Sequence, residues 1–217
     1  MKEVYTVCRT MQALLPEAVQ RPTNARGRRT RAALLAAARA LLEQHGFSLL
    51  NMAAVAERAG VTRRAVYLHF RSRSDLVGAL FEYVAETEGL ADSLQRVRAA
   101  PDAVSALDEW ARHEASYHAR ILPMARALEH VGREDPDAAR WRERIAAHQL
   151  FDCRLLAQRL ADEQRLAPPW TIDSATDMLW ALISTEPLDR LVSDRHWQPE
   201  QYAERFADLL RRTFVAG

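Results

Sequence analysis

The sequence has few cysteines and no long hydrophobic run. Its two cysteines, Cys8 and Cys153, are too far apart in the chain to form a CxxC zinc motif, and two cysteines cannot build a disulfide scaffold. The longest uncharged apolar runs, such as residues 178–183, fall far short of the roughly 20 residues that a membrane span needs. Residues 1–25 also lack the unbroken apolar stretch of a signal peptide. We therefore expect a cytoplasmic protein without a membrane partner.

Glycine and proline are scarce as well, with 7 and 9 residues in a chain of 217. Because the helix-favouring residues alanine, leucine, arginine, glutamate and glutamine are abundant, we expect an all-α fold. Apolar spacing, capping residues and chain breaks predict helices over residues 28–45, 52–59, 63–70, from 72 or 74 into the nineties, 101–131 with a bend or break near Pro123, 137–164, 171–184, 187–193 and 199–214. Residues 1–25 show no clear periodicity, so we expect a flexible N-terminal arm there.

Charge is unevenly distributed along the chain, although the formal net charge is only +1. Residues 21–77 contain 11 arginines and only three acidic residues, whereas acidic residues exceed basic ones in residues 78–217. A basic segment attached to an acidic body favours a polyanion as the partner of the basic segment. The alternative is a merely solvated arginine-rich face, and charge alone does not decide between the two.

Residues 51–70 predict a helix-turn-helix, in which the second helix lies in the major groove of DNA and the first crosses the backbone. Asn51 is a favourable N-cap for the first short helix, Gly60 ends that helix, and Thr62 caps the second. The predicted helix over residues 28–45 supplies the third helix of this head.

The second short helix has one apolar face. Val66 and Phe70 are four residues apart, so we expect both to lie in the core of the head. Arg63 and Arg64 then begin the helix on its outer side. Two arginines are unfavourable at a helix N-terminus. Such a local cost indicates a functional use, here the recognition of guanine edges or phosphates.

Residues 28–87 resemble the DNA-binding domain of the TetR family of bacterial transcriptional regulators. The resemblance rests on motifs that share one register: Gly46-Phe47, Ala59-Gly60-Val61-Thr62, Tyr67-x-His69-Phe70 and Ser72-Arg73-x-x-Leu76. No single motif would identify the family, but their order and spacing do.

The resemblance implies a helix-turn-helix DNA-binding head over residues 26–73, joined to a larger helical domain over residues 74–217 that binds an effector and forms a homodimer. It implies a sequence-specific double-stranded DNA-binding transcriptional regulator, most often a repressor that a small-molecule effector releases from a palindromic operator. A transcriptional activator of the same family is the alternative. We expect the DNA-contacting residues to be Arg28, Asn51, Thr62, Arg63, Arg64, Ala65, Tyr67, His69 and Arg73.

The acidic body predicts a pocket and a dimer surface. Apolar and aromatic residues form a stripe along residues 101–131, which is typical of a core, but the equivalent region of the resembled family lines a small-molecule cavity. The expected pocket residues are Phe81, Trp110, His113, Tyr117, Met124, His148 and Trp180. Residues 178–183 are apolar on all sides of a helix and must be covered, either by a second subunit or by the centre of a monomer. The expected dimer residues are Phe151, Leu155, Met178, Leu179, Leu182 and Ile183.

The usual sequence motifs of catalysis are not found. The chain has no GxGxxG, P-loop, HExxH or GxSxG pattern, and His113, Glu114 and His118 do not have the spacing of a zinc protease. We therefore expect no enzyme, no cofactor and no metal site. A non-catalytic helical module whose basic head binds an acidic protein is the remaining alternative.

Overall fold

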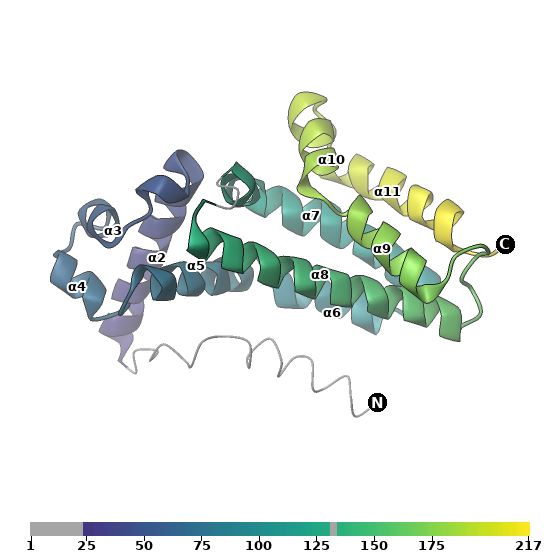
Figure 1. Cartoon of the computed structure of the whole chain (residues 1–217), viewed down its shortest axis with the longest axis horizontal. Coiled ribbons are helices and arrows are strands. Elements are labelled where there is room, and N and C mark those ends of the chain that lie inside the picture. The colour runs from purple at the N-terminus through teal and green to yellow at the C-terminus, as the bar shows by residue number, and fades with distance from the viewer. Residues whose placement is uncertain (1–23, 131–133) are drawn as a thin grey trace. The chain divides into compact units, whose positions relative to one another are not determined.

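The computed structural model describes residues 24–130 and 134–217. All regular elements within these ranges are helical, so the all-α prediction is confirmed (Figure 1). Nearly all of the predicted N-terminal arm lies outside the described residues. None of the helices in the described part of the chain combines the length and the apolarity that crossing a lipid bilayer requires.

The chain forms two compact units. Of the described residues, unit 1 contains 24–84, 130 and 134–138, and unit 2 contains Ala85–Glu129 and Ala139–Gly217. The boundary therefore falls inside a helix and later than residue 73, the predicted end of the DNA-binding head. The segment His130–Ala138 joins unit 1 although it is distant in sequence.

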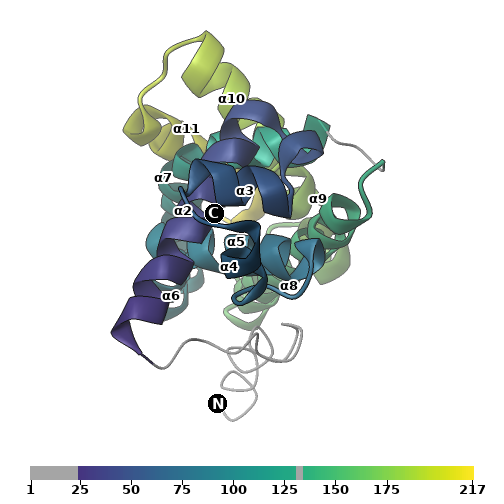
Figure 2. The same ribbon diagram turned by 90° about the vertical axis from the view of Figure 1, so that its left-hand side faces the viewer.

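Unit 1 contains α2 (Ala25–His45), the 3₁₀ turn η1 (Phe47–Leu49), α3 (Met52–Arg58), α4 (Arg63–Tyr67) and most of α5 (Arg73–Thr87). Figure 2 shows α2, α3 and α4 grouped around the start of α5. Their core consists of side chains with no exposed surface, among them Leu34, Leu42, Val55, Val66 and Phe70. The predicted three-helix head is therefore present.

The start of α2 differs from the prediction. The helix begins at Ala25 rather than Arg28, because Asn24 is its N-cap and accepts a hydrogen bond from the backbone N–H of Gly27 at 2.6 Å. Arg26, Arg28 and Arg29 therefore lie in the first turns of a helix and do not precede it. Gly46 ends α2 with φ of 72°, a left-handed backbone conformation that glycine adopts at little cost.

Unit 2 contains α6 (Leu90–Ala99), α7 (Ala103–His130), α8 (Pro136–Asp162), α9 (Ile172–Leu182), α10 (Thr185–Asp189), the π-helical turn η2 (Arg190–Asp194) and α11 (Pro199–Phe214), apart from the ends of α7 and α8 that belong to unit 1. In Figure 1, α7, α8, α9 and α11 run side by side. One apolar cluster joins them, and its most deeply buried members include Leu107, Trp110, Leu160, Leu179 and Phe214.

One helix boundary in the body was wrongly predicted, and the helix that contains Pro123 is not broken there. The helix expected to run into the nineties ends at Thr87, and α6 starts after Gly89, whose φ of 71° is left-handed. The helix expected to bend or break near Pro123 is assigned as helical throughout from Ala103 to His130.

Candidate nucleic-acid interface

Capping side chains fix the geometry of the helix-turn-helix. The Oδ1 atom of Asn51 accepts hydrogen bonds from the backbone N–H groups of Ala53 and Ala54, each at 3.0 Å. The hydroxyl oxygen of Thr62 accepts one from the N–H of Ala65 at 3.2 Å. Gly60 lies between the two helices with φ of 66°, where a side chain would be strained. The predicted caps and turn are thus confirmed.

The inner face of α4 anchors it to the head. Val66 and Phe70 have no exposed surface, as predicted. The guanidinium of Arg31, on α2, lies 4.5 Å from the centre of the Phe70 ring, and its Nη1 donates to the carbonyl of His69 at 3.0 Å. The segment after α4 is therefore held both by apolar burial and by a charge-assisted hydrogen bond.

The outer face of α4 is basic and aromatic. Arg63 and Arg64 are exposed, Tyr67 is 44% exposed and Leu68 is 78% exposed. Nη2 of Arg63 donates to the hydroxyl of Tyr67 at 3.4 Å, and its guanidinium lies 5.7 Å from the centre of that ring. This face presents guanidinium and hydroxyl donors, the groups that recognise phosphates and guanine edges.

The helical part of α4 is shorter than the prediction of residues 63–70, since it ends at Tyr67. His69 follows it and is half-buried. Burial, and then the positive charge of Arg31, lower the pKa of His69 below its usual value. The imidazole is therefore neutral at pH 7, so it offers a hydrogen bond rather than a positive charge.

Arg73, at the first position of α5, has partners within unit 1. Its Nε donates to the carbonyl of Leu50 at 2.7 Å and its Nη2 to the carbonyl of Phe47 at 3.0 Å. The same guanidinium forms ion pairs with Asp135 at 2.6 Å and Asp137 at 2.8 Å. Sequence reasoning missed both aspartates, because they follow Arg73 by more than 60 residues and belong to no motif.

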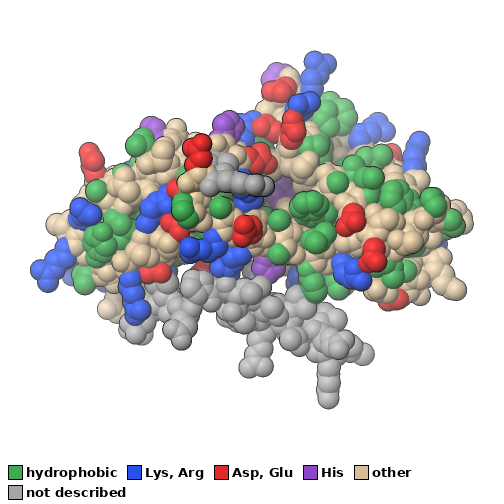
Figure 3. Space-filling view, in the orientation of Figure 1, with side chains coloured by type: hydrophobic (Ala, Val, Ile, Leu, Met, Phe, Trp, Pro, Cys, Tyr) green, Lys and Arg blue, Asp and Glu red, His purple; other side chains and the backbone are tan. Residues whose placement is uncertain are grey.

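The remaining DNA-binding candidates differ in exposure. Arg28 is exposed in the first turns of α2, and Ala65 is half-buried on α4. Blue side chains appear at the end of unit 1 that carries α4 (Figure 3). Arg28, Asn51, Thr62, Arg63, Arg64 and Tyr67 are thus all solvent-accessible on one small unit.

The predicted pocket residues come from both units and differ in exposure. Trp110, His113, Tyr117 and Met124 lie on α7 and are buried. His148 is half-buried on α8, and Phe81 is half-buried on the part of α5 that belongs to unit 1. Trp180 is 41% exposed on α9 and faces solvent, so it is not part of an enclosed lining in this structure.

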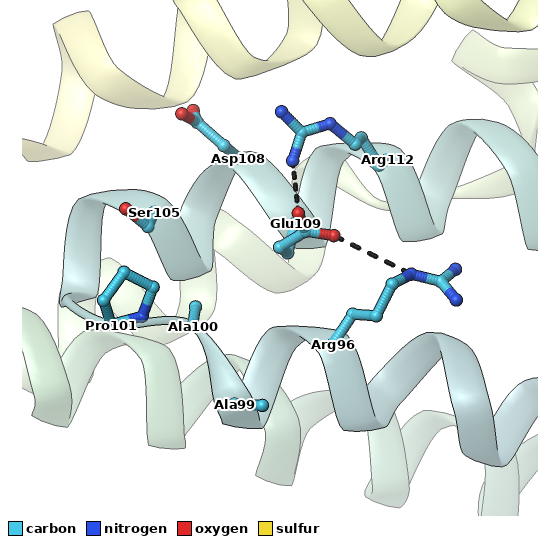
Figure 4. A pocket seen from close by; sticks show the side chains of 8 residues that line it. All are labelled: Arg96, Ala99, Ala100, Pro101, Ser105, Asp108, Glu109 and Arg112. Atoms are coloured by element: carbon cyan, nitrogen blue, oxygen red, sulfur yellow. Dashed lines mark hydrogen bonds and ion pairs between the residues drawn. The ribbon is translucent and has the colours of Figure 1, made fainter.

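A hollow of about 460 Å³ lies elsewhere in unit 2, and none of the predicted pocket residues lines it (Figure 4). Its wall is polar and apolar in about equal parts, and in the polar part Glu109 contacts Arg112 at 2.5 Å and Arg96 at 3.8 Å. Such ion-paired walls do not match the mostly apolar lining that is typical of a drug-sized ligand site.

The predicted dimer residues separate into two sets. Phe151, Leu155 and Met178 are 38%, 42% and 41% exposed, respectively. Leu182 is half-buried, whereas Leu179 and Ile183 pack in the core of unit 2 and are unavailable to a partner. Leu150 and Trp180, each about as exposed as Phe151, also belong to α8 and α9, over which hydrophobic side chains gather in Figure 3.

Part of the chain is similar in sequence to known bacterial regulatory proteins. Residues 34–80 match the model of bacterial regulatory proteins of the tetR family. The HTH-type transcriptional regulator TtgR of Pseudomonas putida is 37% identical over 87 residues, and AcrR of Shigella flexneri is 33% identical over 89 residues. These matches span only about two fifths of this chain and of each relative.

Solved structures extend the likeness to the whole fold. NalD, described as the secondary repressor of the MexAB-OprM multidrug efflux pump in Pseudomonas aeruginosa, is 26% identical, with a TM-score of 0.68 over 88% of this chain and 98% of NalD. A complex of SmeT with triclosan shares the fold at 20% identity, with a TM-score of 0.68 over 87% of this chain and 92% of SmeT. Residues 34–80 thus carry the family domain of the bacterial regulatory proteins of the tetR family, and the whole chain shares the fold of the regulator NalD.

Proposed function

We propose that the protein is a cytoplasmic homodimeric repressor that binds a palindromic double-stranded DNA operator and is released from it by a small-molecule effector. The outer face of α4 is the observation that carries the proposal. It exposes Arg63, Arg64 and Tyr67 on a helix whose opposite face, Val66, is completely buried. The regulators similar to this chain are described as transcriptional regulators and repressors, which supports the same role.

In this proposal α4 enters the major groove, which is about 12 Å wide and admits a single helix. Arg63 and Arg64 donate to guanine N7 and O6 or to phosphate oxygens, and Ala65 contacts a base edge. The contacts that set the register of the protein on the duplex come from the phosphate-facing residues Arg28, Asn51, Thr62, Tyr67 and His69.

Arg73 has a different proposed role from the one its family position implies. Because its guanidinium already holds the Phe47 and Leu50 carbonyls and two aspartates, we assign it as a positioning residue that fixes the start of α5 against the segment before α3. In this role Arg73 affects DNA binding only indirectly, because it stabilises the conformation of the DNA-binding head.

The exposed apolar side chains of α8 and α9 are the proposed dimer surface. They are Leu150, Phe151, Leu155, Met178 and Trp180. A second copy of the chain is the occupant that the proposal requires, since a two-fold symmetric protein reads a two-fold symmetric site. A palindromic operator follows from that symmetry.

Release by an effector requires that the effector bind one arrangement of the dimer more tightly than another. The buried aromatic stripe of α7, with Trp110, Tyr117 and Met124, is the proposed region of effector binding. The structure of SmeT with triclosan supports a small molecule as the class of effector. Activation in place of repression is the second candidate, since it uses the same DNA contacts.

Selection of bound sequences from a random duplex DNA library tests the proposal. The full chain should enrich a palindrome whose half-sites are related by the two-fold axis of the dimer. Arg64→Ala should abolish the enrichment, and the matched variant Arg195→Ala, an exposed arginine of unit 2, should retain it. No enrichment by the folded wild type would contradict DNA recognition. Enrichment of a single non-palindromic half-site would contradict the dimer.

A further inference from the structure

Three side chains of α7 that could bind a metal ion converge inside unit 2. His113 and Glu114 are only 3% and 4% exposed, and His118 is half-buried. One possible ligand atom from each residue lies within 4.8 Å of the others. The ring centroids of the two histidines are 5.2 Å apart. The DNA-binding role proposed above makes no use of these residues.

Two polar atoms in this group lack a hydrogen bond. Oε1 of Glu114 is buried and has no hydrogen-bond partner. Nδ1 of His118 lies 2.7 Å from the other carboxylate oxygen of Glu114, in a geometry that is not a hydrogen bond. Buried polar atoms are nearly always satisfied by a partner, and a cation held between the three side chains would be a partner for Oε1 of Glu114.

His113 is already oriented as a metal ligand. Its Nδ1 lies 2.9 Å from the hydroxyl of Ser93, and this contact orients the ring, as the outer partner of a ligating histidine does. The Tyr117 ring stacks on it with a centroid distance of 5.3 Å. Burial, followed by the charges of His118 and nearby arginines, lowers the pKa of His113 well below its usual value.

Several titratable groups that can carry negative charge lie near Glu114. Burial, with a further contribution from the charge of Glu114, raises the pKa of the Cys153 thiol and of the Tyr202 hydroxyl. The charge of Glu114 also raises the pKa of Asp152, whose cationic partner Arg98 is 3.8 Å away. A bound cation would offset the buried negative charge of Glu114.

We propose that His113, Glu114 and His118 bind one divalent transition-metal ion of the Zn²⁺ class through two imidazole nitrogens and one carboxylate oxygen. Two histidines and a carboxylate are a recognised ligand set for such ions and leave one coordination position open. Bonds of about 2.0–2.2 Å to a tetrahedral ion place ligand atoms about 3.4 Å apart. Because the ligand atoms lie within 4.8 Å of one another, no pair of them needs to close by more than about 1.4 Å.

Metal binding is measured on the tag-free full chain without DNA, so its outcome is independent of the proposed function. The protein is stripped with a chelator and titrated with Zn²⁺ against a chromogenic competitor. We expect one ion per chain. Glu114→Gln and His118→Ala should each weaken Zn²⁺ binding by about 100-fold or more, and Ser93→Ala by about 10–100-fold. The matched variant His45→Ala, an exposed histidine of unit 1, should bind as the wild type does.

Co²⁺ gives a second readout that does not depend on variant stability. The folded wild type should show the intense visible absorption of tetrahedral cobalt, at one ion per chain, and Zn²⁺ should displace it. Absence of this absorption would overturn the proposal even if a buried variant failed to fold. So would Zn²⁺ affinity that Glu114→Gln, which nearly preserves the shape of the side chain, leaves unchanged.

Discussion

Arg73 and Asp135 form an ion pair at 2.6 Å, although 62 residues separate them in the chain. Asp135 also accepts hydrogen bonds from the backbone N–H groups of Asp137 and Ala138 at the start of α8. One guanidinium thus ties together the segment before α3, the start of α5 and the start of α8, all within unit 1. The residue that the family motif assigns to DNA has a structural role in this chain.

Arg73→Ala should therefore lower the free energy of unfolding. It should leave the salt dependence of DNA affinity nearly unchanged. Removing one partner of a well-buried ion pair costs about 3–5 kcal/mol. Because the Arg73 side chain is 28% exposed, solvent screening lowers the expected loss in unfolding free energy to about 1–3 kcal/mol. Urea unfolding measures this loss. A direct phosphate contact would instead reduce the salt slope of DNA affinity by about one, with little loss of stability.

Asn51 combines a cap with a proposed phosphate contact, and two substitutions separate these roles. Asn51→Ala removes the hydrogen bonds to Ala53 and Ala54 and should cost about 1 kcal/mol of unfolding free energy. Asn51→Asp keeps an equally good cap. Its carboxylate would repel phosphate, so it should weaken DNA binding without loss of thermal stability. Unchanged DNA affinity in Asn51→Asp would remove Asn51 from the interface.

The exposed apolar surface of α8 and α9 predicts how the dimer can be broken. Phe151→Glu and Met178→Glu place charges on side chains that are 38% and 41% exposed, so each subunit should stay folded. We expect each variant to raise the dimer dissociation constant about 30-fold or more, the effect of losing an interface hot spot. Sedimentation measures this constant. Leu209→Glu, at a 47% exposed site on α11, is the control and should remain dimeric. An equal effect of all three substitutions would contradict the assigned surface.

Replacing Asp152 with asparagine should stabilise the protein by an amount that depends on pH. Burial raises its pKa to about 6, against the opposing charge of Arg98. As pH rises from about 4 through 6, the unfolded chain releases this proton before the folded protein does, so the contribution of Asp152 to stability falls. Asp152→Asn should therefore be more stable than the wild type at pH 8, by on the order of 2 kcal/mol. The difference should narrow toward pH 4. Chemical denaturation at pH 4 and pH 8 measures the difference in unfolding free energy between the variant and the wild type. A difference that is larger at pH 4 than at pH 8 would contradict the raised pKa of Asp152.

Local patterns were sufficient to predict the head. Asn51, Thr62 and Gly60 each act on a few neighbouring residues, and the four-residue spacing of Val66 and Phe70 directly gives the buried face of α4. The start of α2 was misplaced because its cap, Asn24, stands in a stretch where apolar periodicity is weak.

Contacts between distant segments were not predictable in the same way. The partners of Arg73 come from another part of the chain. Residues 178–183 are all apolar, so no polar residue marked that Leu179 packs inward while Met178 and Trp180 are exposed. Glu114 and His118 are four residues apart on one predicted helix, but only the structure shows that Glu114 is buried together with His113.

The affinity for the selected operator across a salt series tests the central claim, that the outer face of α4 binds DNA. With about four to six phosphate contacts per subunit and a slope of about −0.9 per contact, the dimer should lose several orders of magnitude in affinity over a fourfold rise in salt. The double variant Arg64→Ala, Tyr67→Ala should bind the operator no better than unrelated DNA while it keeps its helicity and dimer mass. Tight, operator-specific binding by that folded double variant would contradict the claim.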